Sequence, residues 1–262
     1  MLKRILILMM VSVLLFACAK KEKANEPQGT VKVEFRNFYL PSFAELFNTL
    51  DNLQKADFDK ALKTEYKNET SDVFLASYYL GYLTADAVIA TKSRNKSKLT
   101  EIANSMIDFS KLIGVKEDVQ KLSDELLNLI QQDKWEELQI SLDKYKNQIE
   151  ISLYETQQFD LLTLVQIGGW TQGLNRICFL INTNYSSPKT EILDQKGILE
   201  VIIYNFDKIE NQEILSKPWY ATIKAKYTDI QTIIKPNSTK SFTKEEVQNL
   251  MKLSQEINDS VK

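Results

Sequence analysis

Proline placement restricts the fold of this chain more than any other feature of the sequence. The five prolines lie toward the two ends of the chain, at Pro27, Pro41, Pro188, Pro218 and Pro236. Residues 42–187 therefore contain none. Proline lacks a backbone N–H and clashes with the preceding helical turn, which makes it the residue most damaging to a helix interior. A proline-free span of this length favours long, uninterrupted helices.

The spacing of apolar residues also indicates helices. Within residues 117–130, for example, apolar side chains recur every three or four positions with acids and lysines between them, as on one face of an amphipathic helix. The same periodicity predicts helices near residues 42–53, 56–66, 71–92, 97–113, 115–131, 134–155, 157–183, 188–209, 217–233 and 243–260. Residues 31–35 alternate like a short strand, but no partner strand is evident, so this segment is expected to lie extended on the body. The predicted fold class is all-α.

Several helix boundaries carry specific signals. Ser42, after Pro41, forms a capping box with Glu45, and Ser187 followed by Pro188 places a cap before a first-turn proline. Thr243 followed by Glu246 forms a capping box, and Phe242 with Val247 supplies a hydrophobic staple. Gly114 follows an amphipathic segment, at the place where a glycine commonly ends a helix. We therefore expect one helix to begin after Thr243 and another to end at Gly114.

Several glycines lie inside apolar, helix-like segments, at Gly81, Gly168, Gly169, Gly173 and Gly197. Glycine in a helix interior costs about 1 kcal/mol relative to alanine, so we expect close packing to require them. Segments 81–85 and 169–173 share a Gly-aromatic-x-x-small pattern, which marks either a duplicated hairpin unit or a chance similarity. The expected architecture is a single domain, residues 31–262. It is a multi-helix bundle of stacked helical hairpins, either tetratricopeptide-like or duplicated.

The most apolar segment after the N-terminus, residues 157–183, is open to two interpretations. As a membrane span, it would present Gly169 and Gly173 as a small-residue packing face. Gln166 and Arg176 argue against a span, because arginine at the centre of a membrane helix costs about 2.5–3.5 kcal/mol. We favour a central core helix that the helix containing Gly81 approaches closely.

Residues 1–17 have the layout of a secretory signal. A basic pair precedes an apolar run, Ile5–Phe16, which is short of the roughly 20 residues that a transmembrane helix needs. The segment Leu15–Cys18 resembles the lipobox of bacterial lipoproteins, although Phe16 is larger than usual at its position. We expect cleavage before Cys18 and acylation of that cysteine, including palmitate. The alternatives are an ordinary secretory signal and a weak N-terminal membrane helix.

Residues 18–30 are expected to form the lipidated cysteine and a disordered tether. They are polar and charged and include Pro27 and Gly29, a composition that buries too little apolar surface to offset the entropy of ordering. Ala19 stands where an aspartate would favour retention at the inner membrane. The expected location is the cell envelope, at the outer membrane rather than the inner one if the cell has two.

Composition argues against several kinds of chemistry. Histidine, the commonest general base and metal ligand, is absent. Cys178 has no partner once Cys18 is acylated, and its apolar neighbours predict a buried thiol. Loss of the basic pair Lys3 and Arg4 shifts the net charge from −2 to −4, which leaves no basic footprint for nucleic acid. We expect no metal, no cofactor, no nucleic-acid partner and no enzymatic activity.

Three short segments carry a resemblance to a known group of proteins. They are Gly81–Asp86 (G-x-x-x-A-D), Leu112–Val115, and Gly168–Leu174 (G-G-W-x-x-G-L). In this order they resemble segments of a group of uncharacterised helical lipoproteins of Bacteroidota, over roughly residues 70–210. Thr171 departs from the aliphatic residue usual in that group. The resemblance implies a helical fold and an envelope location, and it implies no activity.

Two charged residues stand in apolar surroundings and are candidate site residues. Asp86 and Arg176 each lie in an otherwise apolar helical segment. One hypothesis is that the two helices pack and the side chains pair, partly buried, as a structural tie rather than as catalytic groups. The alternative is that both side chains reach solvent on polar helix faces.

The functional hypotheses follow from these features. We favour a non-catalytic helical scaffold or interaction module, held at the membrane by its N-terminal lipid and associated with envelope proteins. The alternative is a lipoprotein that binds a small molecule, lipid or peptide in a cleft between the helices carrying Tyr78 and Tyr82 and those carrying Trp170 and Arg176. The alternative interpretation of these aromatic residues is that they pack in the core and at its rim. A third hypothesis, a carboxylate hydrolase, requires two acids about 5–9.5 Å apart in a cleft.

Overall fold

The computed structural model describes residues 43–53, 56–62, 69–234 and 241–261. The chain divides into a short unit, Met1–Glu34, and a large unit, Phe35–Lys262, and the description below concerns the large unit. The predicted signal peptide, the acylated Cys18, the tether and the extended segment at residues 31–35 lie outside the described residues and stay predictions.

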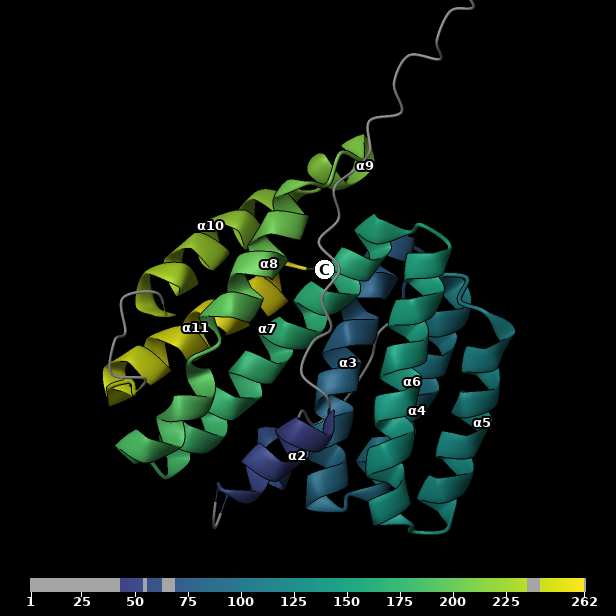
Figure 1. Ribbon diagram of the computed structural model, residues 1–262, viewed down its shortest axis with the longest axis horizontal. Coiled ribbons are helices and arrows are strands. Elements are labelled where there is room, and N and C mark those ends of the chain that lie inside the picture. The colour runs from purple at the N-terminus through teal and green to yellow at the C-terminus, as the bar shows by residue number, and fades with distance from the viewer. Residues whose placement is uncertain (1–42, 54–55, 63–68, 235–240, 262) are drawn as a thin grey trace, which may run out of the picture. The chain divides into compact units, whose positions relative to one another are not determined.

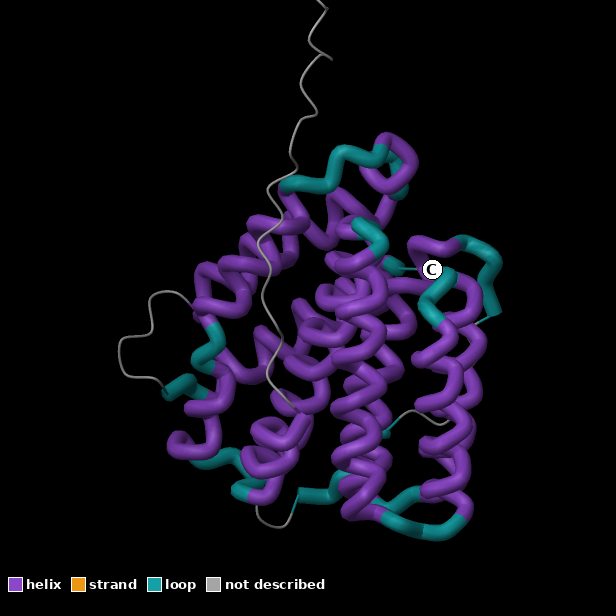
Figure 2. The backbone as a smooth tube through the Cα atoms, turned by 45° about the vertical axis from the view of Figure 1, so that its right-hand side comes forward, coloured by secondary structure: helices purple, strands orange, loops and turns teal. Residues whose placement is uncertain are grey.

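The described residues form helices joined by short loops and contain no strand (Figure 2). The all-α prediction is therefore confirmed, and the helices pack as a bundle. In chain order the elements are α2 (Phe43–Asp51), η1 (Asp59–Ala61), α3 (Val73–Ser93), α4 (Lys96–Leu112), α5 (Glu117–Gln131), α6 (Trp135–Glu155), α7 (Phe159–Thr183), η2 (Ser187–Leu193), α8 (Lys196–Asp207), α9 (Gln212–Leu215), α10 (Pro218–Ile234) and α11 (Lys244–Ser260).

Two of the predicted helices are wrong in part. Of the helix expected at residues 56–66, the described part holds one short 3-10 turn, Asp59–Ala61. The helix expected at residues 188–209 is broken in two, because Ser187–Leu193 winds as a 3-10 segment and α8 begins only at Lys196. Pro188, at the start of that segment, has no N–H to donate. Apolar residues keep a helical spacing on both sides of the break, so their periodicity predicted one continuous helix.

The boundary signals predicted at Thr243 and Gly114 are confirmed. The cap predicted at Ser187 is wrong, because the N-cap residue of the 3-10 segment is Ser186, which makes no side-chain capping hydrogen bond. The cap predicted at Ser42 lies outside the described residues. The Thr243 Oγ1 atom accepts from the backbone N–H of Glu246 at 3.2 Å, and the Thr243 N–H donates to the Glu246 carboxylate at 2.7 Å. Phe242 and Val247 are both buried beside this cap. Gly114 has φ of +73°, the left-handed conformation that glycine adopts without strain.

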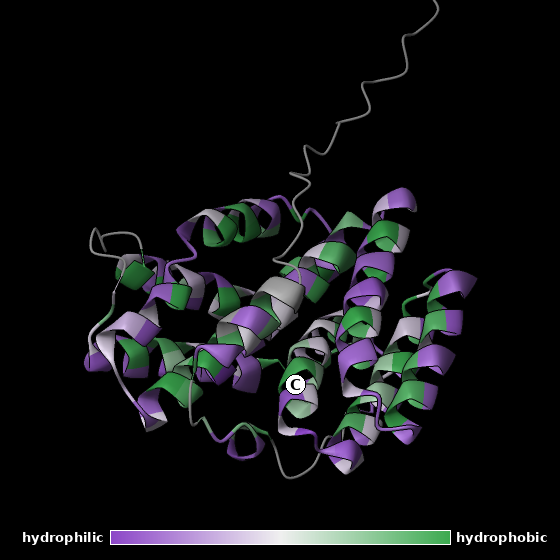
Figure 3. Cartoon of the chain, turned by 60° about the horizontal axis from the view of Figure 1, so that its bottom comes forward, coloured by the Kyte–Doolittle hydropathy of each residue, from purple (hydrophilic) through white to green (hydrophobic). Residues whose placement is uncertain are grey.

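Helices α3 and α7 form the centre of the bundle (Figure 1). Helices α4, α5 and α6 pack on one side of this pair, and α8, α10 and α11 pack on the other (Figure 1). The outer helices carry both polar and apolar residues, as Figure 3 shows by hydropathy. Along α3 and α7, most residues are buried. The segment at residues 157–183 is therefore a core helix of the bundle.

Glycine residues allow the close contact between α3 and α7. A Cβ atom on Gly81 would lie 1.9 Å from the Val165 carbonyl oxygen, and one on Gly168 would lie 2.0 Å from the Tyr78 carbonyl oxygen. No side chain fits at either position, so the two backbones touch directly. The predicted approach of the Gly81 helix is confirmed.

The contacts of α3 with α7 keep the same sequence order in both helices. Tyr78 meets Gly168, Gly81 meets Gly169, and Asp86 meets Arg176. The helices therefore run in the same direction, and the two Gly-aromatic-x-x-small segments face each other at equivalent positions. This is the arrangement that a duplicated unit would produce.

One described helix, α3, is long and apolar enough to cross a membrane. Its residues are mostly buried against the other helices of the bundle. Length and composition of this kind are also typical of the core helix of a water-soluble domain.

Candidate functional site

The predicted charged pair lies at the contact between α3 and α7. The Arg176 Nε atom donates to Asp86 Oδ1 at 2.7 Å, and an η-nitrogen donates to Oδ2 at 3.0 Å. The two parallel bonds match the planar guanidinium to the carboxylate. Asp86 is fully buried and the Arg176 side chain is 9% exposed. The structure thus brings the two residues together, deeper than the partial burial we expected.

Further polar side chains extend this pair toward α11. Gln172 Nε2 donates to Asp86 Oδ1 at 2.8 Å, and its Oε1 atom accepts from Asn258 Nδ2 at 2.8 Å. The Tyr78 hydroxyl in turn donates to Asn258 Oδ1 at 2.7 Å. Burial raises the pKa of Tyr78 well above its usual value, which keeps the hydroxyl a donor. The result is a continuous buried network across three helices.

This network fixes the packing of the core, and none of its residues is among the described residues that line the cavity below. Tyr82, also predicted as a cleft residue, is buried beside it, and burial raises the pKa of its hydroxyl. Buried, mutually satisfied polar groups specify one arrangement of the helices. Asp86, Arg176, Tyr78 and Tyr82 are therefore placed as core residues.

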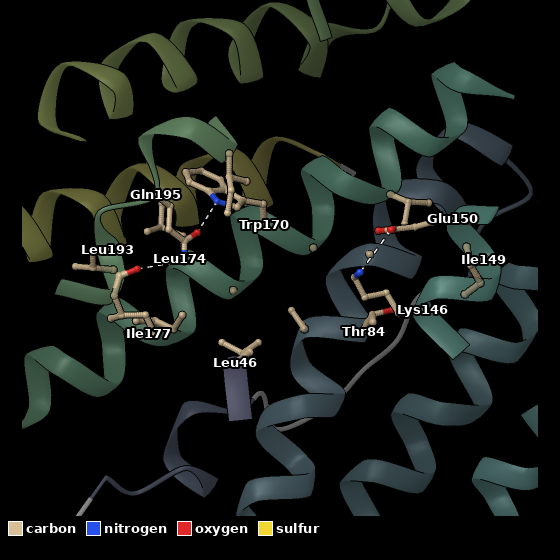
Figure 4. A pocket seen from close by; sticks show the side chains of 17 residues that line it. Leu46, Thr84, Lys146, Ile149, Glu150, Trp170, Leu174, Ile177, Leu193 and Gln195 are labelled. Carbon is tan, nitrogen blue, oxygen red and sulfur yellow. Dashed lines mark hydrogen bonds and ion pairs between the residues drawn. The ribbon is translucent and has the colours of Figure 1, made fainter. Parts of the chain in front are cut away.

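A cavity of about 340 Å³ lies beside the network, between α2, α3, α6, α7 and the η2–α8 segment (Figure 4). Its size is within the usual range for small-molecule sites. Of the residues predicted for a cleft, Trp170 is among those that line it, and Tyr78, Tyr82 and Arg176 are not. The described lining residues are Leu46, Gly81, Thr84, Ala85, Lys146, Ile149, Glu150, Val165, Gly169, Trp170, Gly173, Leu174, Ile177, Ile192, Leu193, Gln195 and Ile198.

One end of the cavity is polar. Lys146 and Glu150 extend from successive turns of α6 toward each other, with Thr84 of α3 nearby (Figure 4). The Lys146 ammonium lies 3.5 Å from Glu150 Oε2, and the two side chains are 6% and 4% exposed. At the long limit of a hydrogen bond, this is a loose contact for a buried pair. Burial raises the pKa of Glu150 to about 6, although the Lys146 charge opposes that rise.

The remainder of the cavity is apolar apart from Gln195, whose side chain is held by two hydrogen bonds. Trp170 Nε1 donates to Gln195 Oε1 at 2.9 Å, and Gln195 Nε2 donates to the Ile192 carbonyl at 3.1 Å. These bonds hold the indole against the wall, where it also stacks on Tyr227 at 5.6 Å between ring centroids. The cavity is therefore elongated, with Lys146 and Glu150 at a charged end and Trp170 at an apolar end.

Three glycines leave the space open. Gly81 and Gly169 lie at the α3–α7 crossing and contribute backbone to the cavity wall. Gly173 also lines the cavity, and a Cβ atom placed there would meet nothing within 4 Å. The small-residue face predicted at Gly169 and Gly173 is thus covered by α3 at Gly169 and borders the cavity at Gly173.

The site offers few reactive groups. Glu150 is the one carboxylate among the described lining residues, so the pair of acids that a carboxylate hydrolase requires is not in this cavity. No three His, Cys, Asp or Glu side chains in the described part of the chain lie close enough to hold a metal ion. Cys178 is fully buried, and burial raises the pKa of its thiol.

Lys146 and Glu150 were not predicted as site residues. A usable signal was present, because Lys146 and Glu150 each follow a buried apolar residue, Tyr145 and Ile149, by one position. Residues four apart lie on the same face of a helix, so the two charges lie together beside the apolar stripe. Periodicity alone predicts only an amphipathic helix for this segment. No family model, curated protein or solved structure matches this chain, so its resemblance to Bacteroidota lipoproteins rests on the three short segments alone.

Proposed function

We propose that this protein is a lipid-anchored envelope protein that binds a small, largely apolar molecule in the cavity between α3, α6 and α7. The observation that supports binding is the cavity itself, about 340 Å³ and lined mainly by aliphatic side chains. Apolar pockets with a few placed polar groups are typical of small-molecule sites.

The geometry gives less support to the scaffold hypothesis. A protein-docking surface usually presents a contiguous apolar patch. In the described part the large exposed hydrophobic residues are Leu112 on α4 and Ile140 and Tyr154 on α6, too few to form a patch of that kind. Tyr154 is moreover in edge contact with the Phe159 ring. We therefore place the binding function ahead of the scaffold that the sequence favoured.

Anchorage is supported by the sequence of residues 1–18. A basic pair, an apolar run and a small residue before Cys18 are the features that lipidation requires. Two or more acyl chains on one cysteine hold a protein firmly at a bilayer. The test is metabolic labelling with radioactive palmitate, which should mark the native protein and leave a Cys18→Ser form unlabelled. Equal labelling of the two would contradict the proposal.

Binding can be tested with a neutral apolar dye, N-phenylnaphthylamine, whose fluorescence rises in dry surroundings. The native protein should enhance its emission saturably. Gly173→Phe inserts a ring into the open space and should abolish the enhancement. Gly197→Phe is the matched control, because a Cβ atom added at Gly197 would also meet nothing within 4 Å, but this residue lies on α8 outside the cavity lining. Equal dye binding by the two variants would contradict the proposed site.

A further inference from the structure

The two ends of the cavity differ in their access to solvent. All the described lining residues that come from α3 and α6 are buried. The described lining residues that are half-buried come from α2, α7 and the η2–α8 segment, and they are Leu46, Gly169, Gly173, Ile192, Gln195 and Ile198. In Figure 4, Glu150 and Ile149 lie on the opposite side of the cavity from Leu193. The cavity therefore has a mouth between α2 and the η2–α8 segment and a closed end at α3 and α6.

The uncharged polar side chains of the cavity wall are bonded within the protein. Thr84 Oγ1 donates to the Leu80 carbonyl oxygen at 2.6 Å. Gln195 accepts from Trp170 and donates to the Ile192 carbonyl oxygen. These bonds hold the wall in place, and the side chains around them are aliphatic. Affinity for a ligand then comes mainly from the burial of apolar surface.

The closed end carries two opposite charges that face each other. The Lys146 ammonium and the Glu150 carboxylate form an ion pair there, and both side chains are more than nine-tenths buried. A charge without a partner is costly in such a place. A charged head group at the closed end would add a third charge to this pair, whereas the end of a hydrocarbon chain leaves the pair as it is.

We infer that the cavity takes the unbranched hydrocarbon chain of an amphiphile, with the chain end at the closed end and the polar head outside at the mouth. The inference rests on the proposed binding function, and it adds the class of ligand and the direction in which it enters. The elongated space suits an extended chain. Leu46, Ile192 and Ile198 give the mouth an apolar rim, and none of the described lining residues there is charged. Recognition then depends on the length of the chain and not on the charge of the head.

The volume of the cavity limits the length of chain that it can bury. At roughly 30 Å³ for each water in the liquid, a cavity of about 340 Å³ holds the equivalent of about eleven waters. A methylene group takes up nearly as much space as a water molecule, so the cavity holds a chain of about ten carbons. The carbons of a longer chain would extend into solvent.

The first test varies the chain and keeps the head constant. The full-length Cys18→Ser protein is titrated by calorimetry with alkylphosphocholines of six to fourteen carbons, each below its micellar concentration. We expect the affinity to rise about fourfold for each added methylene group that is buried. The rise should end at about ten carbons. An affinity that is independent of chain length, or that rises without a limit, would overturn the inference.

The second test varies the head and keeps the chain constant. Decanol, decanoate, decylamine and decylphosphocholine are compared at pH 8, where the ion pair is charged because burial raises the pKa of Glu150 only to about 6. We expect the four affinities to agree within about threefold, since the head lies outside. A tenfold preference for the anionic or the cationic head would place the head at the ion pair and overturn the inference.

Two matched substitutions test the direction of the chain. Ile149→Ala enlarges the closed end and should move the limit to longer chains. Ile198→Ala removes the same atoms at the mouth and should not lengthen the limit. If circular dichroism finds Ile149→Ala unfolded, Ile149→Val makes the same test with a smaller step. An unchanged limit in the folded closed-end variant would contradict the proposed direction.

The outcomes separate this inference from the proposed function. If no amphiphile binds but N-phenylnaphthylamine still does, and Gly173→Phe abolishes the dye signal, the inference fails and the apolar cavity remains a binding site. If the dye does not bind either, or if Gly173→Phe binds dye and amphiphiles as the native protein does, the proposed function itself is wrong.

Discussion

Arg176 on α7 is joined to Asp86 on α3 by two charge-assisted hydrogen bonds, of 2.7 Å and 3.0 Å, at a fully buried carboxylate. The same Asp86 Oδ1 atom also accepts from Gln172 at 2.8 Å. These bonds satisfy the carboxylate on both oxygens and cross the tightest helix contact of the bundle. Asp86 therefore links two helices whose sequences are almost entirely apolar.

Replacing Asp86 by alanine should destabilise the fold strongly. The Arg176 guanidinium would remain buried without its counter-charge, a situation that costs about 3–5 kcal/mol. Chemical denaturation of Asp86→Ala should report a loss of that order in the free energy of unfolding. Glu136→Ala is the control, because that side chain is 78% exposed and loses only a 3.4 Å contact to Arg94, which should change the same quantity by about 0.5 kcal/mol or less. Similar losses in the two variants would mean that the buried bond contributes little.

Helix bounds were predicted best in long segments that are rich in apolar residues and contain no proline. Helices α3 and α7 were predicted to within about two residues, because neither contains a proline and both are rich in apolar residues along their whole length. The break between η2 and α8 was not predicted, since Ile192 and Leu199, seven residues apart, both pack on the core and continue one apolar spacing across it. The hydrophobic pattern predicts which face of a segment packs on the core, but it does not predict where the chain changes direction.

The cavity could not be predicted for a different reason. Gly168 and Gly173 lie five residues apart in one helix and look equivalent in the sequence, yet a side chain would strike backbone at the first and meet open space at the second. Only the placement of α2, α3, α6 and α8 around α7 distinguishes them. A cavity depends on how several segments, distant in sequence, pack around it. No local sequence pattern predicts that packing.

The two kinds of glycine should respond oppositely to alanine. At Gly81 a Cβ atom would lie 1.9 Å from the Val165 carbonyl oxygen, so α3 and α7 must separate, and we expect a loss of about 3 kcal/mol or more in the free energy of unfolding. At Gly173 nothing lies within 4 Å of an added Cβ atom. Gly173→Ala should therefore raise the free energy of unfolding by about 0.5–1 kcal/mol, because alanine has the higher helix propensity. Thermal melts of both variants test this, and a destabilising Gly173→Ala would show that its surroundings are packed.

The titration of Glu150 should leave a signature in stability against pH. Its folded-state pKa is raised from 4.5 to about 6, so the folded state holds the proton more tightly than the unfolded state. The resulting stabilisation is complete below pH 4.5 and is lost as pH rises through about 6, by about 2 kcal/mol at 1.36 kcal/mol per pKa unit. The free energy of unfolding of the native protein minus that of Glu150→Gln should fall across this window.

A matched substitution controls for the loss of a carboxylate. Lys226 lowers the pKa of the exposed Glu256, so its contribution has the opposite sign and is lost as pH falls. The native-minus-variant difference for Glu256→Gln should therefore not decline between pH 4.5 and pH 6. A flat difference for Glu150→Gln would contradict the buried, proton-binding state assigned to Glu150.

The Cys178 thiol should report on unfolding of the core. It is fully buried in α7, and burial raises its pKa, so almost no reactive thiolate exists in the folded protein. In the full-length Cys18→Ser form, where Cys178 is the one remaining cysteine, maleimide should label at least about a hundredfold more slowly than after unfolding, because reaction requires opening of the core. Ser187→Cys in the same background adds an exposed thiol that should label at once. Rapid labelling of Cys178 under native conditions would mean that α7 opens to solvent and is not the fixed centre of the bundle.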